Sequence, residues 1–319
     1  MSSSTSSFRN ELKVLAVVLA VVGALEAWQR MRYVHRPFEA AMLRNFPALA
    51  DRLSDRRYTG LVLLGNSLTQ NGYNLPLLRQ TLEEAGNGDL HVESIALSGS
   101  NPIEWYHNLA VNFMRRGKTP DVVVINMSPS GISDELPAGY RIGWLAHETD
   151  WRDVPEVLFD DLNNTEVGGQ YLQARVSMLY ANRWDIRVEL LNNLIPAAKA
   201  GMQWVNSGQP APKARPGDVP PRKTYSLLAR LLDLARSNGA HVVLVAMPAR
   251  EGYTIDPGLP GILKEYGVTF LDCRMVPGLT EEGFEDGWHL NPSGAKVFTP
   301  YIAEQLAAAA KGFVVRKEK

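Results

Sequence analysis

The chain alternates short, almost wholly apolar runs with longer segments whose apolar residues recur at helical spacing. Five apolar runs lie at residues 60–65, 91–97, 121–127, 240–247 and 267–272. Val, Ile and Leu dominate them, as in "GLVLLG" and "DVVVINM". Unbroken runs of this kind are typical of strands that are buried on both faces of a parallel sheet. We therefore predict a doubly wound, flavodoxin-like α/β fold, with about five parallel strands in the middle layer of an α/β/α sandwich.

The segments between the apolar runs have the length and spacing of helices. We predict helices near 75–86, 102–116, 222–237, 258–266 and 292–311, and a polar-faced helix at 38–57 before the first strand. We expect residues 37–319 to form one globular domain.

One stretch of this domain, residues 134–221, is too long for a simple crossover, and we predict a helical or irregular insertion there. It contains Trp144, Trp151, Trp184 and Trp204 and ends in a Pro-rich segment. These tryptophans either pack the insertion onto the sheet or belong to a cap that holds a substrate such as a sugar.

The N-terminal segment, residues 1–36, contains the apolar run "VLAVVLAVVGAL" at 14–25. We predict an N-terminal membrane helix that anchors the protein, with Arg9, Lys13 and Glu26 reaching toward water. A cleaved signal peptide with the small-residue site Val22-Gly23-Ala24 and a buried helix of the domain are the alternatives. Basic residues on both sides of the run leave its orientation open, and charge counting alone weakly places the bulk of the chain inside.

Composition excludes several classes of function. The formal net charge is -1 and no basic run is interleaved with aromatic residues, so we expect no nucleic-acid partner. Cys273 is the only cysteine, which rules out an intrachain disulfide and a cysteine-based metal cage. The five histidines other than His289 lack a carboxylate placed as Asp286 is, and no pair has metal-ligand spacing. We predict neither a metal nor an organic cofactor.

Ser67 follows the first apolar run directly, in "LVLLGNSLTQNGYN". Ligands of open parallel sheets bind outside the carboxyl ends of the strands, so a serine at this strand-to-helix turn is placed for function. Its backbone N–H lies near a helix N-terminus, which favours an oxyanion. A simple helix N-cap is the alternative role for Ser67.

A base for this serine is present near the other end of the chain. In "DGWHLNPSGAKVF", Asp286 precedes His289 by three residues, just before a helix that starts with proline. At this distance the carboxylate can orient the imidazole and leave its other nitrogen free for Ser67.

Three motifs together resemble those of the SGNH/GDSL hydrolase family: "GNSLT" around Ser67, "ALSGSNP" around Gly99, and "DGWHLNPSGAKVF". The resemblance covers roughly residues 60–133 and 222–311. It implies Ser67 as nucleophile, His289 as general base and Asp286 as its orienting partner. It also implies that the backbone N–H groups of Ser67 and Gly99 donate to the oxyanion.

The sequence departs from the family pattern at two positions. Asn66 replaces the aspartate that is usual in the first block, a change that should leave the nucleophile's chemistry intact. Ser130 stands where the third block supplies an asparagine to the oxyanion hole. Asn126 is a poor substitute by register, so we expect either Ser130 or Asn101 to help, a modest activity, or a site adapted to a different acceptor.

The resemblance implies a serine-dependent esterase that acts on acyl esters, of which acetyl esters are our first expectation. An O-acyltransferase that modifies a cell-envelope or extracellular polysaccharide is the first alternative, because membrane-anchored relatives look like this. A non-catalytic binding protein on the same fold is the second. We expect a membrane-anchored protein whose globular domain is periplasmic or otherwise outside the cytoplasm.

Overall fold

The structure is a computed structural model that describes residues 4–35, 39–55, 57–127, 132–136, 142–162, 164–195 and 224–310. Its centre is a sheet of five strands, all paired in parallel, in the order β2-β1-β3-β4-β5. The strands are β1 (Thr59–Gly65), β2 (Leu90–Ala96), β3 (Val122–Met127), β4 (His241–Ala246) and β5 (Thr269–Asp272). Each lies within three residues of its predicted bounds, and the order is that of flavodoxin-like folds. The predicted fold class is therefore confirmed.

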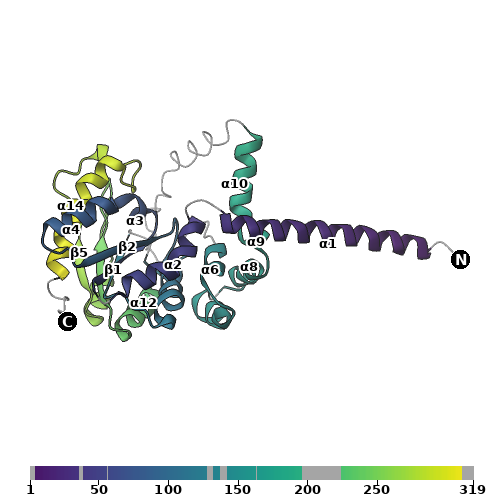
Figure 1. Ribbon diagram of the computed structural model, residues 1–319, viewed down its shortest axis with the longest axis horizontal. Coiled ribbons are helices and arrows are strands. Elements are labelled where there is room, and N and C mark those ends of the chain that lie inside the picture. The colour runs from purple at the N-terminus through teal and green to yellow at the C-terminus, as the bar shows by residue number, and fades with distance from the viewer. Residues whose placement is uncertain are drawn as a thin grey trace, which may run out of the picture.

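Helices cover both faces of the sheet, so the sheet is the middle layer of a three-layer sandwich (Figure 1). They are α2 (Glu39–Leu53), α3 (Ser67–Gly72), α4 (Leu75–Glu84), α5 (Pro102–Asn108), α12 (Ser226–Ser237), α13 (Leu259–Glu265) and α14 (Pro292–Ala310). The predicted helix at 102–116 is not uniform: after α5 it continues as a π-helical turn, Leu109–Phe113, and a 3₁₀ turn, Met114–Arg116.

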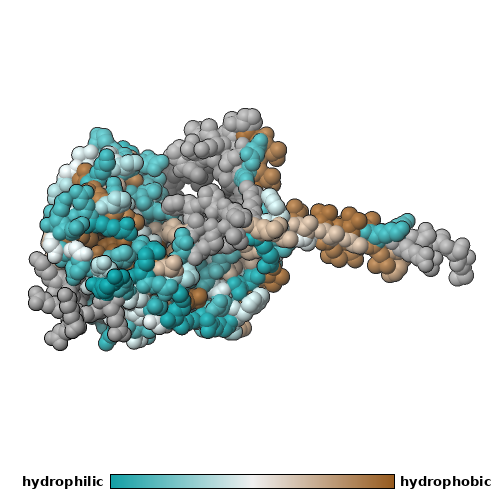
Figure 2. Space-filling model, viewed as in Figure 1, coloured by the Kyte–Doolittle hydropathy of each residue, from teal (hydrophilic) through white to brown (hydrophobic). Residues whose placement is uncertain are grey.

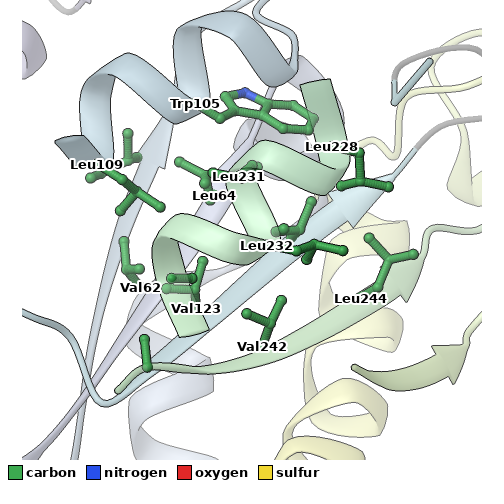
Figure 3. Packing of buried hydrophobic residues seen from close by; sticks show 14 of the residues in the cluster. Val62, Leu64, Trp105, Leu109, Val123, Leu228, Leu231, Leu232, Val242 and Leu244 are labelled. Atoms are coloured by element: carbon green, nitrogen blue, oxygen red, sulfur yellow. The ribbon is translucent and has the colours of Figure 1, made fainter. Parts of the chain in front are cut away.

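Side chains that point alternately to the two faces of the sheet form two separate hydrophobic cores. Val62 and Leu64 of β1 belong to a cluster with residues of α2, α5, α12 and α13, part of which is drawn in Figure 3. Leu61 and Leu63 face the other way and pack with residues of α4 and α14. Because successive strand residues point to opposite faces, a run of consecutive Val and Leu supplies both cores.

The insertion forms its own small core against the helical layer. Its elements are α6 (Ile142–Glu148), a 3₁₀ turn Trp151–Asp153, α7 (Val154–Glu156), a π-helical turn Val157–Asp161, α8 (Thr165–Val176), α9 (Met178–Ala181) and α10 (Arg183–Leu194). Leu145 and Tyr171 pack with Ile103 of α5 and Leu227 of α12. Ile103 and Leu227 lie at the N-termini of α5 and α12, which begin near the carboxyl ends of the strands. The insertion therefore sits beside the edge of the sheet where the strands end.

The insertion's tryptophans have different environments. Trp144 is buried, whereas Trp151 is 61% exposed and has the Arg175 guanidinium 4.8 Å from its ring centroid. Packing thus accounts for Trp144, while Trp204 lies outside the described residues.

The N-terminal part of helix α1 (Ser4–His35) projects away from the domain (Figure 1). Its base is docked through Glu26, whose carboxylate accepts hydrogen bonds from the Met178 N–H (2.7 Å), the Leu179 N–H (3.1 Å) and the Ser177 hydroxyl (3.0 Å). Arg30 pairs with Glu26 at 2.9 Å and donates to the Val176 carbonyl. The pair therefore joins α1 to the end of α8 and the start of α9.

Among the described residues, no helix is long and apolar enough to cross a membrane. The predicted membrane-spanning helix is corrected on this point. The uninterrupted apolar run has only twelve residues, 14–25, or about 18 Å at 1.5 Å per residue, against a hydrocarbon core of about 30 Å. The polar residues that follow, beginning with Glu26, bind the globular domain instead of continuing the run.

Candidate active site

Ser67 lies at the carboxyl end of β1, as the first residue of α3. Asn66 is the N-cap of this helix: its side chain accepts from the Leu68 N–H at 3.1 Å, and its carbonyl accepts from Thr69 and Gln70. None of these bonds uses the Ser67 N–H. Gly65, two residues before Ser67, cannot carry a side chain, because a Cβ there would collide with the Thr69 hydroxyl. The turn therefore presents both the hydroxyl and the N–H of Ser67 at the edge of the sheet.

His289 and Asp286 lie in a tight loop immediately before α14. The loop is closed by an isolated antiparallel bridge between Phe284 and Leu290, and the Glu285 N–H donates to the His289 carbonyl at 2.8 Å. Asn291 then caps α14 by accepting from two of its first N–H groups.

The structure brings the three predicted residues into one hydrogen-bonded chain. His289 Nε2 is 2.8 Å from Ser67 Oγ, and His289 Nδ1 is 2.7 Å from Asp286 Oδ2. The serine and the histidine are 222 positions apart in the chain, so the fold alone makes this contact.

Asp286 is ionised at neutral pH. Burial alone would raise the pKa of its carboxyl, but bonds from the His289 N–H and ring and from the Trp288 N–H hold the pKa below the ordinary value of 3.8. A carboxylate facing Nδ1 requires a proton on that nitrogen, so the imidazole is the tautomer whose Nε2 can accept from Ser67. The side chains of His289 and Asp286 are 28% and 48% exposed, which leaves the chain open to a substrate.

The residues considered as oxyanion donors differ in where the structure places them. Gly99 lies in the turn after β2 with a φ of 78°, a left-handed conformation that suits glycine. Ser130 lies outside the described residues. Asn126 is fully buried in β3, where Tyr73 Oη donates to its Oδ1 at 2.5 Å, so it does not face the site.

Asn101, the other expected donor, is the N-cap of α5. Its Oδ1 accepts from the Ile103 N–H at 2.9 Å, and its Nδ2 is buried without a hydrogen-bond partner among the described residues. Because this nitrogen is also closed off from solvent, the role of Asn101 as an oxyanion donor stays a prediction.

A second polar cluster lies between α5 and the insertion. His107 Nε2 bonds Asp161 Oδ2 at 2.6 Å, a contact that the sequence pattern did not indicate. Arg230 pairs with both Asp161 and Glu156, and Arg115 pairs with Asp153. His107 and Asp161 are 54 positions apart in the chain, which explains why spacing did not predict the contact.

His107, Asp153 and Glu156 are also the one group in the described part of the chain whose ligand atoms lie close enough to hold a metal ion, within 4.8 Å of one another. The two carboxylates already pair with arginines, so we assign the group to an ion-pair network that holds the insertion.

No protein-family model matches the sequence, and no curated protein is similar enough to match. Solved structures do resemble the chain. One is a lipase/acylhydrolase from Enterococcus faecalis, with a TM-score of 0.39 and 13% identity over 78% of this chain and 96% of that one. Another is a catalytic mutant of an acetylxylan esterase from Geobacillus stearothermophilus, with a TM-score of 0.39 and 13% identity over 77% and 92% of the two chains.

Proposed function

We propose that the protein is a serine-dependent esterase that cleaves acyl esters, of which acetyl esters are the first candidates. The observation that carries the proposal is the hydrogen-bonded chain from Asp286 through His289 to Ser67. A serine hydroxyl is a weak nucleophile unless an adjacent base takes its proton, and here an oriented imidazole lies at 2.8 Å. The three motifs and the flavodoxin-like strand order support membership of the SGNH/GDSL family as part of the same proposal.

In the proposed reaction, Ser67 Oγ attacks the ester carbonyl carbon while His289 Nε2 takes the hydroxyl proton. Asp286 stabilises the imidazolium, and the Ser67 and Gly99 N–H groups donate to the oxyanion of the tetrahedral intermediate. The C–O bond to the alcohol breaks as His289 returns the proton to the leaving oxygen. Water, deprotonated by His289, then attacks the acyl-enzyme and releases the acid and free Ser67. Ser130 stays a proposed third donor.

Ser67→Ala tests the proposal directly. It should lower turnover of an aryl acetate by about 10⁶-fold and abolish labelling by a fluorophosphonate, because the atom that forms the bond is gone. Ser54→Ala is a matched control: this hydroxyl, just after α2, donates to the Ala50 carbonyl and should be dispensable for turnover. Labelling of Ser67→Ala at the wild-type rate would contradict the assignment, and a wild-type protein that neither turns over nor labels would favour a binding protein.

A second candidate function is transfer of the acyl group to a polysaccharide hydroxyl. Trp288, which directly precedes His289, is 42% exposed, and an exposed indole is a suitable surface for a sugar ring. The acyl-enzyme would be the same, but a sugar hydroxyl would replace water. Partition of a labelled acetyl group between water and added glycans separates transfer from hydrolysis.

We also propose that the protein works at a lipid surface, with its domain outside the cytoplasm. Eight Val and Leu residues of α1, between residues 14 and 25, are each 44% or more exposed. They occur at nearly consecutive positions and therefore surround the helix. Figure 2 shows hydrophobic residues on the face of α1 that is turned toward the viewer. A helix that is apolar all round requires an apolar environment.

A further inference from the structure

Gln70 connects the helix of the proposed nucleophile to the loop that carries Gly99. It lies on α3, three residues after Ser67. Its Nε2 donates to the carbonyl of Ala96, the last residue of β2, at 3.1 Å. Its Oε1 accepts from the hydroxyl of Ser98, which directly precedes Gly99, at 3.0 Å. A primary amide can donate from its nitrogen and accept at its oxygen at the same time.

The other side of Gly99 is held to the same turn. The Ser100 hydroxyl donates to the Gly65 carbonyl at 3.0 Å and accepts from Trp105 Nε1 at 2.8 Å. The Leu97 N–H donates to the same Gly65 carbonyl at 3.3 Å. Residues on both sides of Gly99 are thus bonded to residues of the Ser67 turn.

Gly99 has little else to hold it. It is exposed, and a Cβ built on it would have nothing within 4 Å. Its position relative to Ser67 therefore depends on the bonds of its neighbours.

We propose that Gln70 is a positioning residue that sets the distance between the Gly99 N–H and Ser67, and with it the geometry of the oxyanion hole. The inference rests on the proposed function, because it gives these two N–H groups a common target. An oxyanion donor acts only within about 2.7–3.1 Å of the developing charge. A misplacement of about 1 Å can cost about 10²-fold in rate. Gln70 itself touches neither substrate nor the reacting atoms.

The test is Gln70→Met in the full chain, which keeps the length of the side chain and removes both bonds. We expect kcat for an aryl acetate to fall at least about tenfold with KM little changed, because the donor is used mainly in the transition state. The pH profile should keep its shape, since Asp286 and His289 are untouched. Combining Gln70→Met with Ser98→Ala should add little, because both remove the same bridge. Gln80→Met is the matched control, since the Gln80 side chain donates to the exposed Glu84 on α4.

Hydrogen exchange of residues 97–101 gives a readout that does not need activity. Exchange there should be faster in Gln70→Met than in wild type or Gln80→Met, at a matched melting temperature. Unchanged exchange overturns the inference whether or not the protein turns over esters. Faster exchange with unchanged kcat in an active protein overturns the link to the oxyanion hole. A wild-type protein without Ser67-dependent turnover contradicts the proposed function instead, and exchange then still decides whether Gln70 holds the loop.

Discussion

At the scale of single residues, the departure at Asn66 has a structural explanation. The side chain at this position caps α3 by accepting from the Leu68 N–H. Asn and Asp are about equally good N-caps, so an asparagine keeps the turn that presents Ser67. The change removes a negative charge beside the nucleophile and leaves the local backbone as it is.

Asp286→Asn tests the orienting role of the carboxylate. The amide can present its NH₂ to His289 Nδ1, which favours the tautomer with the proton on Nε2 and removes the acceptor for Ser67. We expect kcat to fall by about 10⁴-fold, as for other serine triads, with the fold intact. Steady-state kinetics and far-UV circular dichroism measure the two.

Asp55→Asn is the control for this substitution. Asp55 also has a lowered pKa, about 2, because Arg57 bonds it, but it precedes β1 at the opposite end of the strand from Ser67. Its kcat should match wild type. A loss of activity that is equal in both variants would contradict a specific role for Asp286.

At the scale of elements, the contact between α5 and α6 contains a buried acid. Burial raises the pKa of the Glu148 carboxyl well above its ordinary 4.5, and the Glu104 carboxylate raises it further, while Asn108 Nδ2 opposes the shift by donating at 3.4 Å. The folded state therefore keeps a proton that the unfolded chain loses near pH 4.5. Stability from this group is complete below that pH and is lost as pH rises through the folded pKa.

Glu148→Gln should remove this pH dependence. A glutamine can still accept from Asn108 but does not ionise, so its unfolding free energy relative to wild type should increase from pH 5 to pH 8. Each unit of pKa difference is worth about 1.4 kcal/mol, which urea denaturation at several pH values resolves. Glu83→Gln, on the exposed side of α4, should show no such trend. A constant difference between Glu148→Gln and wild type across this range would contradict the buried-acid interpretation.

The strands could be predicted from the sequence because burial on both faces leaves a continuous apolar signal, as in β3. The widened turn after α5 could not. Apolar spacing tolerates one extra residue per turn, so it does not separate an α-helix from a π-helical turn such as Leu109–Phe113.

The same difference holds for the site. Ser67, Asp286 and His289 were found because each lies in a short motif with its own chemical logic. Gln70 gave no comparable signal, since its bonds depend on a strand end 26 residues away. Catalytic motifs can be recognised in the sequence, whereas the hydrogen bonds that position them form between segments that only the fold brings together.

At the scale of the whole molecule, the error over α1 has the same origin. Glu26 was expected to reach from a membrane helix toward water, but it binds residues more than 150 positions away. Its carboxylate satisfies N–H groups at the start of α9, which have no intrahelical acceptors. The C-terminal part of α1, from Glu26 on, is thereby bound to the globular domain. The exposed apolar run at residues 14–25 remains free to contact a lipid surface.

The lipid-surface proposal predicts that the full chain floats with phosphatidylcholine vesicles in a density gradient. An apolar run of about 18 Å is long enough for one leaflet, roughly half of a 30 Å hydrocarbon core. Flotation should persist at about 1 M salt, where the Debye length is about 3 Å, because apolar burial and not charge supplies the affinity. The double substitution Val18→Asp and Val22→Asp should abolish flotation, since it places two carboxylates in the run. Phe159→Asp removes an apolar side chain that is 77% exposed on the insertion, and flotation should survive it. If instead the full chain stays below the vesicles and sediments as a dimer that the double substitution dissociates, α1 binds a second copy and the lipid proposal is wrong.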